Sequence, residues 1–488
     1  MKIQLKSTGI YLLFSFLSFF LCLTSCKKDF SAKNSANGQF NRSTKALYTD
    51  GRPVPTVVQT LSGLITGTRS LSNDTLYYLN GPVFVDSLAT LNIEEGTFIK
   101  GLDKPNTTSG FASYLVVRRG GKIFADGTAT EPIVFTSQYS ANSRNEGDWG
   151  GIVILGQAPV NNVRPKIEGI PSAQIPAALS GKDAIGYGGE IENDNSGRLV
   201  NVRIEFAGEV ITDGNELNGL TLGGVGSGTT LDHIQVSVGA DDAFEFFGGS
   251  VNATNLISYF NDDDDFDFDQ GYEGSIQFAV AQKDPNTSLY PRSSNPNGIE
   301  SNNVTSPIIT GGTYSTRITN PILSNFSILG DTTTAPSNGT GTVFRAGSSG
   351  VFKNSVVGGF YAGANLGAAA GSLVYSNNYL HYFTNNGYPS SGNTIDNTDP
   401  NFFLLTAPYN GTAPDWRYIT DAINGIFSPL ASGWNSGSLT VTHTGGSLSS
   451  FTNTGFVGAF GENDGSSATT NRWDSTGWAS YTPRTNTY

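Results

Sequence analysis

Residues 231–252 read LDHIQVSVGADDAFEFFGGSVN, and residues 253–274 read ATNLISYFNDDDDFDFDQGYEG. Both segments alternate apolar and polar residues over short stretches, which is typical of β-strands with one buried face. Both also contain Gly, Asn and Asp where a chain would turn. The segments match at an offset of 22 residues (266 − 244 = 22), and the matched pairs are Asp241 with Asp263, Asp242 with Asp264, Phe244 with Phe266, Glu245 with Asp267, Phe246 with Phe268 and Gly249 with Gly271.

The repeat continues upstream, because residues 219–222 match residues 243–246 at an offset of 24 (243 − 219 = 24). Two or three short strands per repeat, stacked on the next repeat at about 4.8 Å, form one coil of a β-helix. Inward residues then lie above one another, so the repeated Phe residues form aromatic ladders. A sandwich or barrel also has short strands but needs no repeat of coil length. The sequence therefore predicts an all-β fold, a single-stranded right-handed parallel β-helix (a solenoid).

The rest of the chain indicates one long body. It contains 60 Gly, 30 Phe and only 14% charged residues, a composition that favours short strands and turns over helices. No Pro-rich or Ser-rich linker interrupts it, and a repeat architecture accounts for the length. We expect one parallel β-helix domain at residues 53–488. Within it, residues 162–190 are predicted to be a loop excursion from the coils, and residues 456–488 a C-terminal cap.

The first residues predict an export signal. Lys2 and Lys6 precede an apolar run at residues 10–23. This run is shorter than the apolar stretch that a transmembrane helix needs. The end of this segment, Leu23-Thr24-Ser25-Cys26, resembles the bacterial lipobox, in which the Cys is acylated and becomes the first mature residue. The alternative is an ordinary signal peptide with a Cys there by chance. We expect a lipoprotein signal peptide at residues 1–25, lipidation of Cys26, and a flexible tether at residues 26–52, which lack hydrophobic periodicity.

The cysteine count agrees with lipidation. Of the 2 Cys, Cys22 lies inside the predicted signal and Cys26 would carry the lipid, so no disulfide is expected in the mature body. The expected location is the cell envelope, as an outer-membrane lipoprotein that is periplasmic or surface-exposed and held to the outer membrane by its lipid anchor. The net charge of −13 becomes −15 without Lys2 and Lys6 (−13 − 2 = −15), which argues against nucleic acid as a partner.

Several stretches are also similar to a known family. They are GTFIKG (96–101), VVRRGGKIFADGTATEPIVFTS (116–137), GDWGGIVILGQAPVN (147–161), DNSGRLVNVRIEFAG (194–208), NGLTLGGVGSGT (218–229) and DDAFEFFGGSVN (241–252). They resemble exported right-handed parallel β-helix lipoproteins of Bacteroidota, within the pectate-lyase-like group of folds. The ending FVGAFGEND (456–464), with Trp473 and Gly477-Trp478, resembles that family's C-terminal cap. The resemblance implies the fold and no particular activity.

The acidic residues of the repeat are the main candidates for a binding site. With the Phe residues inward, Glu245 and Asp267 point outward, one above the other, and like charges at that spacing repel. A bound cation would relieve the repulsion, and carboxylate oxygens at flexible corners suit calcium. The alternative is a solvated acidic ridge. The candidate calcium ligands are Asp241, Asp242, Glu245, Asp263, Asp264 and Asp267.

Candidates for catalysis lack a matching motif, and we assign no catalytic residue. Polysaccharide lyases on this fold place a Lys or Arg base near bound calcium. Arg203 and Lys283 are the nearest residues of that kind, although Arg203 can equally pair with Glu205 or the acidic coil. Glycoside hydrolases use paired carboxylates instead, and the acids available for such a pair are Glu300, Asp263 and Asp264.

Two further residue types bear on a site. The histidines, His233, His381 and His443, lack metal-ligand spacing and are expected to be strand or loop residues. Tyrosines beside the acidic coils would suit stacking on a sugar, and the alternative is that they belong to the core. These candidate ligand-binding residues are Tyr259, Tyr272 and Tyr290.

Three functions fit these features. The first is a cell-envelope lipoprotein that binds a glycan, matrix or envelope protein partner, or has a structural role at the surface. The second is a calcium-assisted polysaccharide lyase or glycoside hydrolase. The third is an accessory lipoprotein of an outer-membrane importer.

The anchoring prediction is tested by Cys26→Ala. Without the acylated side chain, the exported protein should move from the membrane fraction to the soluble fraction, because lipid alone holds it. Fractionation followed by flotation of the membranes measures this. A Cys26→Ala protein that still floats with lipid would show that Cys26 is not the anchor.

Overall fold

The residues that the computed structural model describes all lie within the unit Lys45–Tyr488. The predicted signal, Cys26 and most of the tether lie outside the described residues. In the described part, no helix is both long and apolar enough to span a membrane. The described residues are 47, 48, 50–163, 165–212, 215–284, 295–303, 317–330, 339–367, 372–384, 389, 391–395, 451, 458–460 and 473–488.

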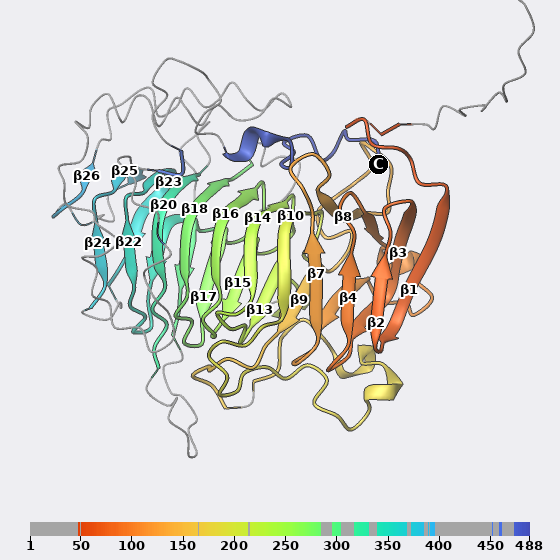
Figure 1. Ribbon diagram of the computed structural model, residues 1–488. Helices are drawn as coiled ribbons and strands as arrows, with labels where there is room; N and C mark the ends of the chain where they lie inside the picture. Colours follow the sequence, from red (N-terminus) through yellow and green to blue (C-terminus); the bar gives the residue numbers. More distant parts are fainter. Residues whose placement is uncertain are drawn as a thin grey trace, which may run out of the picture. The chain divides into compact units, whose positions relative to one another are not determined.

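This unit is a parallel β-helix, as predicted (Figure 1). Each coil passes through three hydrogen-bonded ladders, A, B and C in chain order, and the strands within each ladder pair in parallel. Ladder A consists of β2 (Thr68–Leu71), β4 (Thr90–Ile93), β7 (Lys122–Asp126), the first halves of β10 (Gly197–Glu205), β14 (Thr230–Ser237), β16 (Asn252–Tyr259), β18 (Ser275–Gln282) and β20 (Ile322–Leu329), then β22 (Val351–Lys353) and β24 (Val374–Ser376).

Ladder B contains the first halves of β1 (Val57–Ile65) and β3 (Thr75–Val85), then β5 (Phe98–Gly101), β8 (Ile133–Ser137), the second halves of β10, β14, β16, β18 and β20, the first part of β23 (Val356–Asn365), β25 (Tyr379–Thr384) and β26 (Thr394–Ile395). Ladder C contains the second halves of β1 and β3, then β6 (Tyr114–Val117), β9 (Ile152–Leu155), β13 (Leu220–Gly223), β15 (Phe244–Phe247), β17 (Phe266–Asp269), β19 (Ile299–Ser301), β21 (Thr340–Phe344) and the end of β23.

The chain bends between ladders A and B at one residue with a positive φ angle. Among non-glycine residues, Asn adopts this left-handed conformation most readily. Asn therefore recurs at this corner and marks the coil boundary in the sequence. The residues at the corner, with φ from 49° to 63°, are Asn201, His233, Asn255, Phe278, Asn325, Asn354 and Asn377.

The core lies inside the coils and consists of side chains that stack from coil to coil. Phe244 pairs with Phe266, and Phe246 pairs with Phe268, so the predicted offset of 22 is confirmed. The ring centres are 5.4 Å and 5.1 Å apart, and both pairs are stacked. Leu220 pairs with Phe244, which confirms the offset of 24. The same residues belong to the main hydrophobic core.

The segment 162–190 departs from the coils between β9 and β10 and packs on the outer side of ladder C. Tyr187 of this excursion lies over Gly223, where a Cβ would be only 2.8 Å from the tyrosine ring. Glycine therefore permits the close approach. The elements outside the ladders are η1 (Lys104–Asn106), η2 (Ser172–Gln174), η3 (Ala177–Leu179), the antiparallel pair β11 (Val210–Thr212) and β12 (Asn215–Glu216), and η9 (Trp473–Thr476).

The described C-terminal residues pack along one face of the stack. Residues 473–488, here called the strap, lie along the outer side of ladder B (blue in Figure 1). The backbone of Ser480 exchanges two hydrogen bonds of 2.7 Å with the side chain of Gln235 on β14. Tyr488 reaches Phe98 on β5, with the ring centres 5.2 Å apart. The aromatic side chains of these residues are buried against a face of the stack, and most of residues 456–472 of the predicted cap lies outside the described residues.

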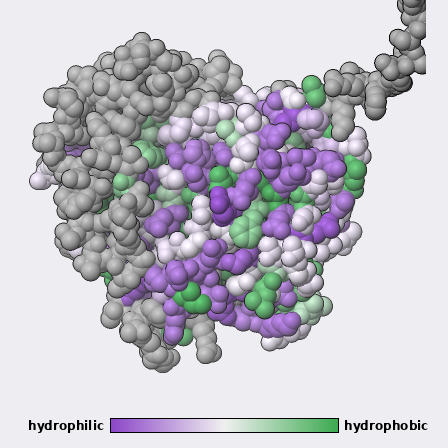
Figure 2. All heavy atoms as spheres, viewed as in Figure 1, coloured by the Kyte–Doolittle hydropathy of each residue, from purple (hydrophilic) through white to green (hydrophobic). Residues whose placement is uncertain are grey.

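The face formed by ladder A is mostly hydrophilic in the view of Figure 2, with hydrophobic residues scattered among polar ones. Single exposed apolar residues, such as Leu88 at 91% exposure, are normal on a protein surface. The described part of this face thus offers no broad apolar area for docking.

The stacked core is tested by Phe266→Ala. Removing this buried ring, which contacts Phe244 and Phe326, should cost about 3–5 kcal/mol of unfolding free energy. The matched control is Asp269→Ala on the same strand, which removes a partly exposed carboxylate and should change stability little. Thermal or denaturant unfolding measures both. Equal, small effects would contradict the inward placement of Phe266.

Candidate metal centre

Ladder C places polar side chains above one another on the outside of the stack. The two Phe residues of β17 point into the core, so Asp267 between them points outward. Asp267 pairs in register with Glu245 on β15 and with Glu300 on β19. Glu245 pairs in turn with Thr221 on β13. These four residues form an outward column across four successive coils.

The corner that leads into ladder C adds a second row of carboxylates. The backbone N–H of Asp264 donates to Asp242 Oδ1 at 2.9 Å, which joins two coils. Asp264 Oδ1 accepts from the backbone N–H of Asn297 at 2.6 Å and extends the row to the next coil. Asp241 and Asp263 occupy the more exposed positions of the same corner.

The column and the corner bring carboxylate oxygens together in three overlapping sets. Within each set, one oxygen of each residue lies within 4.8 Å of the others. Asp242 and Asp267 each belong to two sets, so the sets are continuous along the stack. All six predicted ligands belong to them, together with Glu300. The sets are Asp241, Asp242 and Asp263; Asp242, Glu245 and Asp267; and Asp264, Asp267 and Glu300.

Most of this acidic cluster is buried. Asp242, Glu245 and Glu300 are 8%, 5% and 6% exposed. The excursion contributes to the burial, since the Tyr187 hydroxyl donates to Gln270 Oε1 at 2.8 Å, next to the end of β17. The alternative prediction of a solvent-exposed acidic ridge therefore fits only the outer corner around Asp263. The carboxylates of the inner column are largely shielded from solvent.

Burial and mutual repulsion both disfavour the charged carboxylates. Burial raises the pKa of Asp242, Glu245 and Asp267 well above the usual range, and neighbouring carboxylates raise each further. For Glu245, the largest neighbouring effect comes from Glu168 of the excursion. The pKa of Glu168 itself rises to about 7 through burial and repulsion from Glu216. A divalent cation would favour the charged forms instead.

Amide and guanidinium groups hold the carboxylates in place. Asn218 donates to Glu245 Oε2, and Asn302 donates to Glu300 Oε1 at 2.7 Å. Arg345 forms an ion pair with Glu300. Burial nevertheless leaves the pKa of Glu300 raised, although the Arg345 charge lowers it. The far end of the column is thus partly neutralised.

The donor set fits calcium, which takes six to eight oxygen ligands from carboxylates, carbonyls and water. Two oxygens in the column point to an additional ligand. Thr221 is 2% exposed, and its Oγ1 has no hydrogen-bond partner among the described residues. The same holds for the buried Oδ1 of Asp267. Buried oxygens without partners are costly, and a cation bound beside either one would engage it.

The sequence repeat did not identify three residues of the acidic cluster or its surroundings, namely Glu300, Glu168 and Thr221. Glu300 follows Asp267 by 33 residues (300 − 267 = 33), because an insertion lengthens that coil and hides the match. Glu168 belongs to the irregular excursion, whose position no repeat specifies. Thr221 carries no charge, and its only sequence signal was the offset of 24 from Glu245.

The two candidate bases are engaged in buried ion pairs. Arg203 Nε lies 3.4 Å from Glu205 Oε1 on ladder B, as one of the predicted alternatives had it. Lys283 Nζ lies 3.3 Å from Asp265 Oδ1. Both basic side chains are at most 5% exposed. A base that acts on a polysaccharide must be accessible from solvent, and neither Arg203 nor Lys283 is.

The histidines occupy structural positions where they are described. His233 is a corner residue, and its Nδ1 lies 2.6 Å from Asp232 Oδ1. His381 on β25 is 1% exposed. His443 lies outside the described residues.

The tyrosines predicted to stack on a sugar do not form a surface. Tyr272 is fully buried in the core, where its ring stacks on Phe268 and its hydroxyl donates to Val251 O. Tyr259 is 3% exposed beneath Tyr481 of the strap. The prediction is wrong for both, because the core and the strap use these rings for packing. Tyr290 lies outside the described residues.

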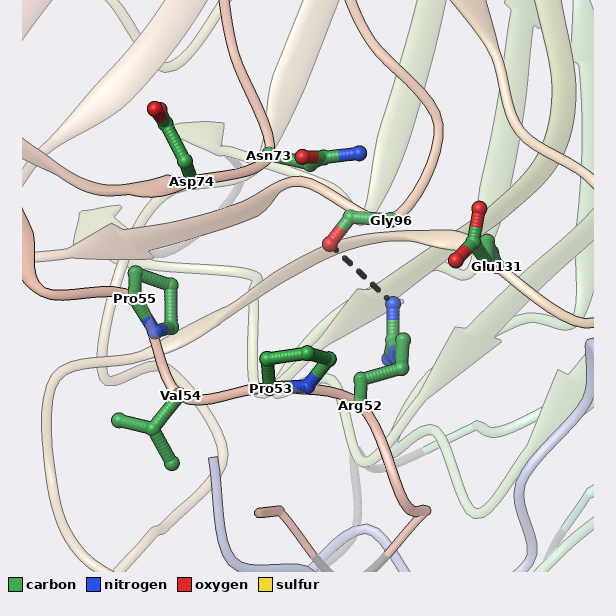
Figure 3. A pocket seen from close by; sticks show the side chains of 8 residues that line it. All are labelled: Arg52, Pro53, Val54, Pro55, Asn73, Asp74, Gly96 and Glu131. Atoms are coloured by element: carbon green, nitrogen blue, oxygen red, sulfur yellow. Dashed lines mark hydrogen bonds between the residues drawn. The ribbon is translucent and has the colours of Figure 1, made fainter. Parts of the chain in front are cut away.

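A small pocket of about 160 Å³ lies elsewhere, at the first coils (Figure 3). Arg52 reaches across it and donates to Gly96 O at 3.4 Å and to Pro132 O at 2.6 Å. The acids on its lining, Asp74 and Glu131, belong to turns of different coils. The pocket shares no residue with the acidic cluster.

Comparison with known proteins identifies the family. The model of the pectate-lyase-like β-helix domain family matches residues 63–397, more than half of the chain. The chain belongs to this family. Among solved structures, this pectate-lyase-like β-helix is similar to the crystal structure of Dettilon tailspike protein (gp208), with 13% identity and a TM-score of 0.22. That match covers 65% of this chain and 62% of the tailspike chain, so it spans less than two thirds of the tailspike. No curated protein matches the sequence.

The raised pKa values predict how stability depends on pH. In the metal-free protein, the pKa of carboxyls such as Glu245 and Asp264 lies above the unfolded value of about 4. The folded state then binds more protons, so its stability falls as the pH rises through the folded pKa values, with Glu168 at about 7. The melting temperature in chelator should therefore decrease between about pH 5 and pH 8. Calcium should reduce that slope, and a metal-free melting temperature that rises over this range would contradict the prediction.

Proposed function

We propose that this protein is a cell-envelope lipoprotein whose β-helix binds calcium in the acidic cluster and thereby holds a glycan of its surroundings. One observation carries the proposal. Carboxylate oxygens from three successive coils lie in overlapping sets within 4.8 Å, and most of these groups are buried. Charged carboxylates packed in this way need a cation to offset the repulsion.

The placement of the cluster supports a binding role for the cation. Asp241 and Asp263 lie at the partly exposed corner, while Glu245 lies in the buried column. A calcium ion at the corner has protein ligands on the inner side only. Its other positions are open to oxygens from outside, and the carboxylates and hydroxyls of a glycan provide such ligands.

The envelope location is predicted from the sequence alone, on the motif that ends at Cys26. A lipid-anchored body with an acidic surface attracts calcium toward its own ligands and repels other anions. An acidic glycan would therefore bind only through the cation, which makes the binding reversible by chelation. The polysaccharide lyase or hydrolase remains the alternative, and a family of pectate-lyase-like fold is compatible with both.

Calcium binding is tested by unfolding at matched ionic strength. Millimolar calcium should raise the melting temperature, because a ligand at a hundredfold excess over its dissociation constant adds about 2.7 kcal/mol. Asp263→Asn combined with Asp267→Asn should abolish the response and leave a folded protein, since amides remove repulsion together with the ligands. The matched control is Glu94→Gln with Glu131→Gln, which removes two exposed carboxylates of the first coils and should keep the full response.

Two results would count against the cation site. Sodium chloride that stabilises as well as calcium at matched ionic strength would show that screening alone relieves the repulsion. Retention of the calcium response in the double variant would place the ion elsewhere.

Glycan binding is tested separately with an immobilised acidic polysaccharide. Binding should require calcium, disappear with chelator and be lost in the Asp263→Asn, Asp267→Asn double variant. Binding that persists in chelator would contradict the role of the cation. Release of unsaturated or reducing ends during the incubation would favour the enzyme.

A further inference from the structure

A buried ion pair lies beside the acidic cluster without belonging to it. Lys283 follows β18, and Asp265 precedes β17, with Nζ 3.3 Å from Oδ1. Their side chains are 1% and 0% exposed. The pair therefore lies inside the stack, out of contact with water.

Neighbouring groups fix both partners in this geometry. Lys283 Nζ donates to the backbone oxygen of Asp263. Ser258 Oγ donates to Asp265 Oδ1 at 2.5 Å, and Asn261 donates in turn to Ser258 Oγ at 2.9 Å. Neither side chain can swing away without breaking these contacts. The amine and the carboxyl group are thus held against each other.

An ion pair in this position is a poor source of stability by itself. Both charges lose their water, and their mutual attraction does not reliably recover that loss. The same contact holds a nitrogen nucleophile beside the carboxyl group whose carbon it would attack, since Nζ lies 3.3 Å from Oδ1. A nucleophile held next to its target in a fixed orientation gains a large effective concentration.

We propose that Lys283 and Asp265 condense to an intramolecular isopeptide bond. The Lys283 ammonium first transfers one proton to the Asp265 carboxylate, which frees the lone pair of the amine. Nζ then attacks Asp265 Cγ and forms the C–N bond. One C–O bond of the carboxyl group breaks, and its oxygen leaves as water with the transferred proton and a second proton from Nζ. An ammonium and a carboxylate thus become a neutral amide and one water. The step needs no oxidant, reductant or co-substrate.

The surroundings favour the amide once it forms. Exclusion of water removes the reagent for hydrolysis, and the amide replaces two buried charges with a neutral group. The bond joins the end of β18 to the start of β17 and closes one coil covalently. Like a disulfide, such a link limits the unfolded chain. The sequence has no Cys after Cys26, so no disulfide can serve this purpose in the body.

Peptide mapping of the purified full-length protein tests the proposal. Between Arg203 and Lys283 the sequence has no Lys or Arg, and the next is Arg292. Because trypsin does not cut after an acylated Lys, the denatured protein should yield peptide 204–292 uncut at Lys283 and lighter by one water. Chymotrypsin should then cleave between Asp265 and Lys283, for example after Phe278, and leave the two fragments joined.

The matched control is Lys283→Arg, which retains the positive charge beside Asp265 but should not condense. Its denatured chain should be cut at position 283, its peptides should have full mass, and its melting temperature should be lower than that of the parent.

The mapping of the parent protein decides the matter even if the variant fails to fold. Complete cleavage after Lys283 with peptides of full mass would overturn the proposal. A water loss with cleavage at Lys283 and no joined fragments would indicate a succinimide at an Asp residue, and this would overturn it as well.

Discussion

The structure depends on one constraint, which is that successive coils pair in parallel and in register. Each residue then has the equivalent residue of the next coil directly above it, at strand spacing. For Phe244 and Phe266 this produces stacked rings in the core. For Asn201 and Asn255 it produces a column of left-handed corners. The same geometry therefore decides the packing, the shape of the coil and the position of every repeated side chain.

Register has an electrostatic cost when the repeated residue is acidic. Glu245, Asp267 and Glu300 stack for the same reason as the Phe residues beside them, yet each added carboxylate raises the pKa of the others. The aromatic ladder tolerates this arrangement because it buries apolar area on the other side of the same strands. The stability that the buried inner face of these strands provides thus allows carboxylates to repel one another on the outer face. The surrounding structure in this way offsets a locally unfavourable arrangement of charges.

Sequence reasoning succeeded where a residue's role follows from its period. Alternation in 241–252 and 253–274 placed the Phe residues inward and the acids outward, and the register agrees. It failed where a role depends on segments far away in the chain. Tyr259 is buried because the strap covers it, and no pattern around residue 259 specifies that contact. Glu168 reaches the acidic cluster from an excursion whose path depends on Tyr187 and Gly223, a contact made across separate segments.

The strap changes how a solenoid can come apart. In a repeat protein each coil contacts only its neighbours, so the ends can open one coil at a time, independently of the middle. Here Gln235 on β14 and Lys100 on β5 both bind the strap, through Ser480 and Tyr488. Opening of the coils near β5 must therefore break contacts to a segment that is also fastened several coils away. Fraying at that end becomes linked to the middle of the stack, and the amide protons of both regions should exchange with solvent as one cooperative unit.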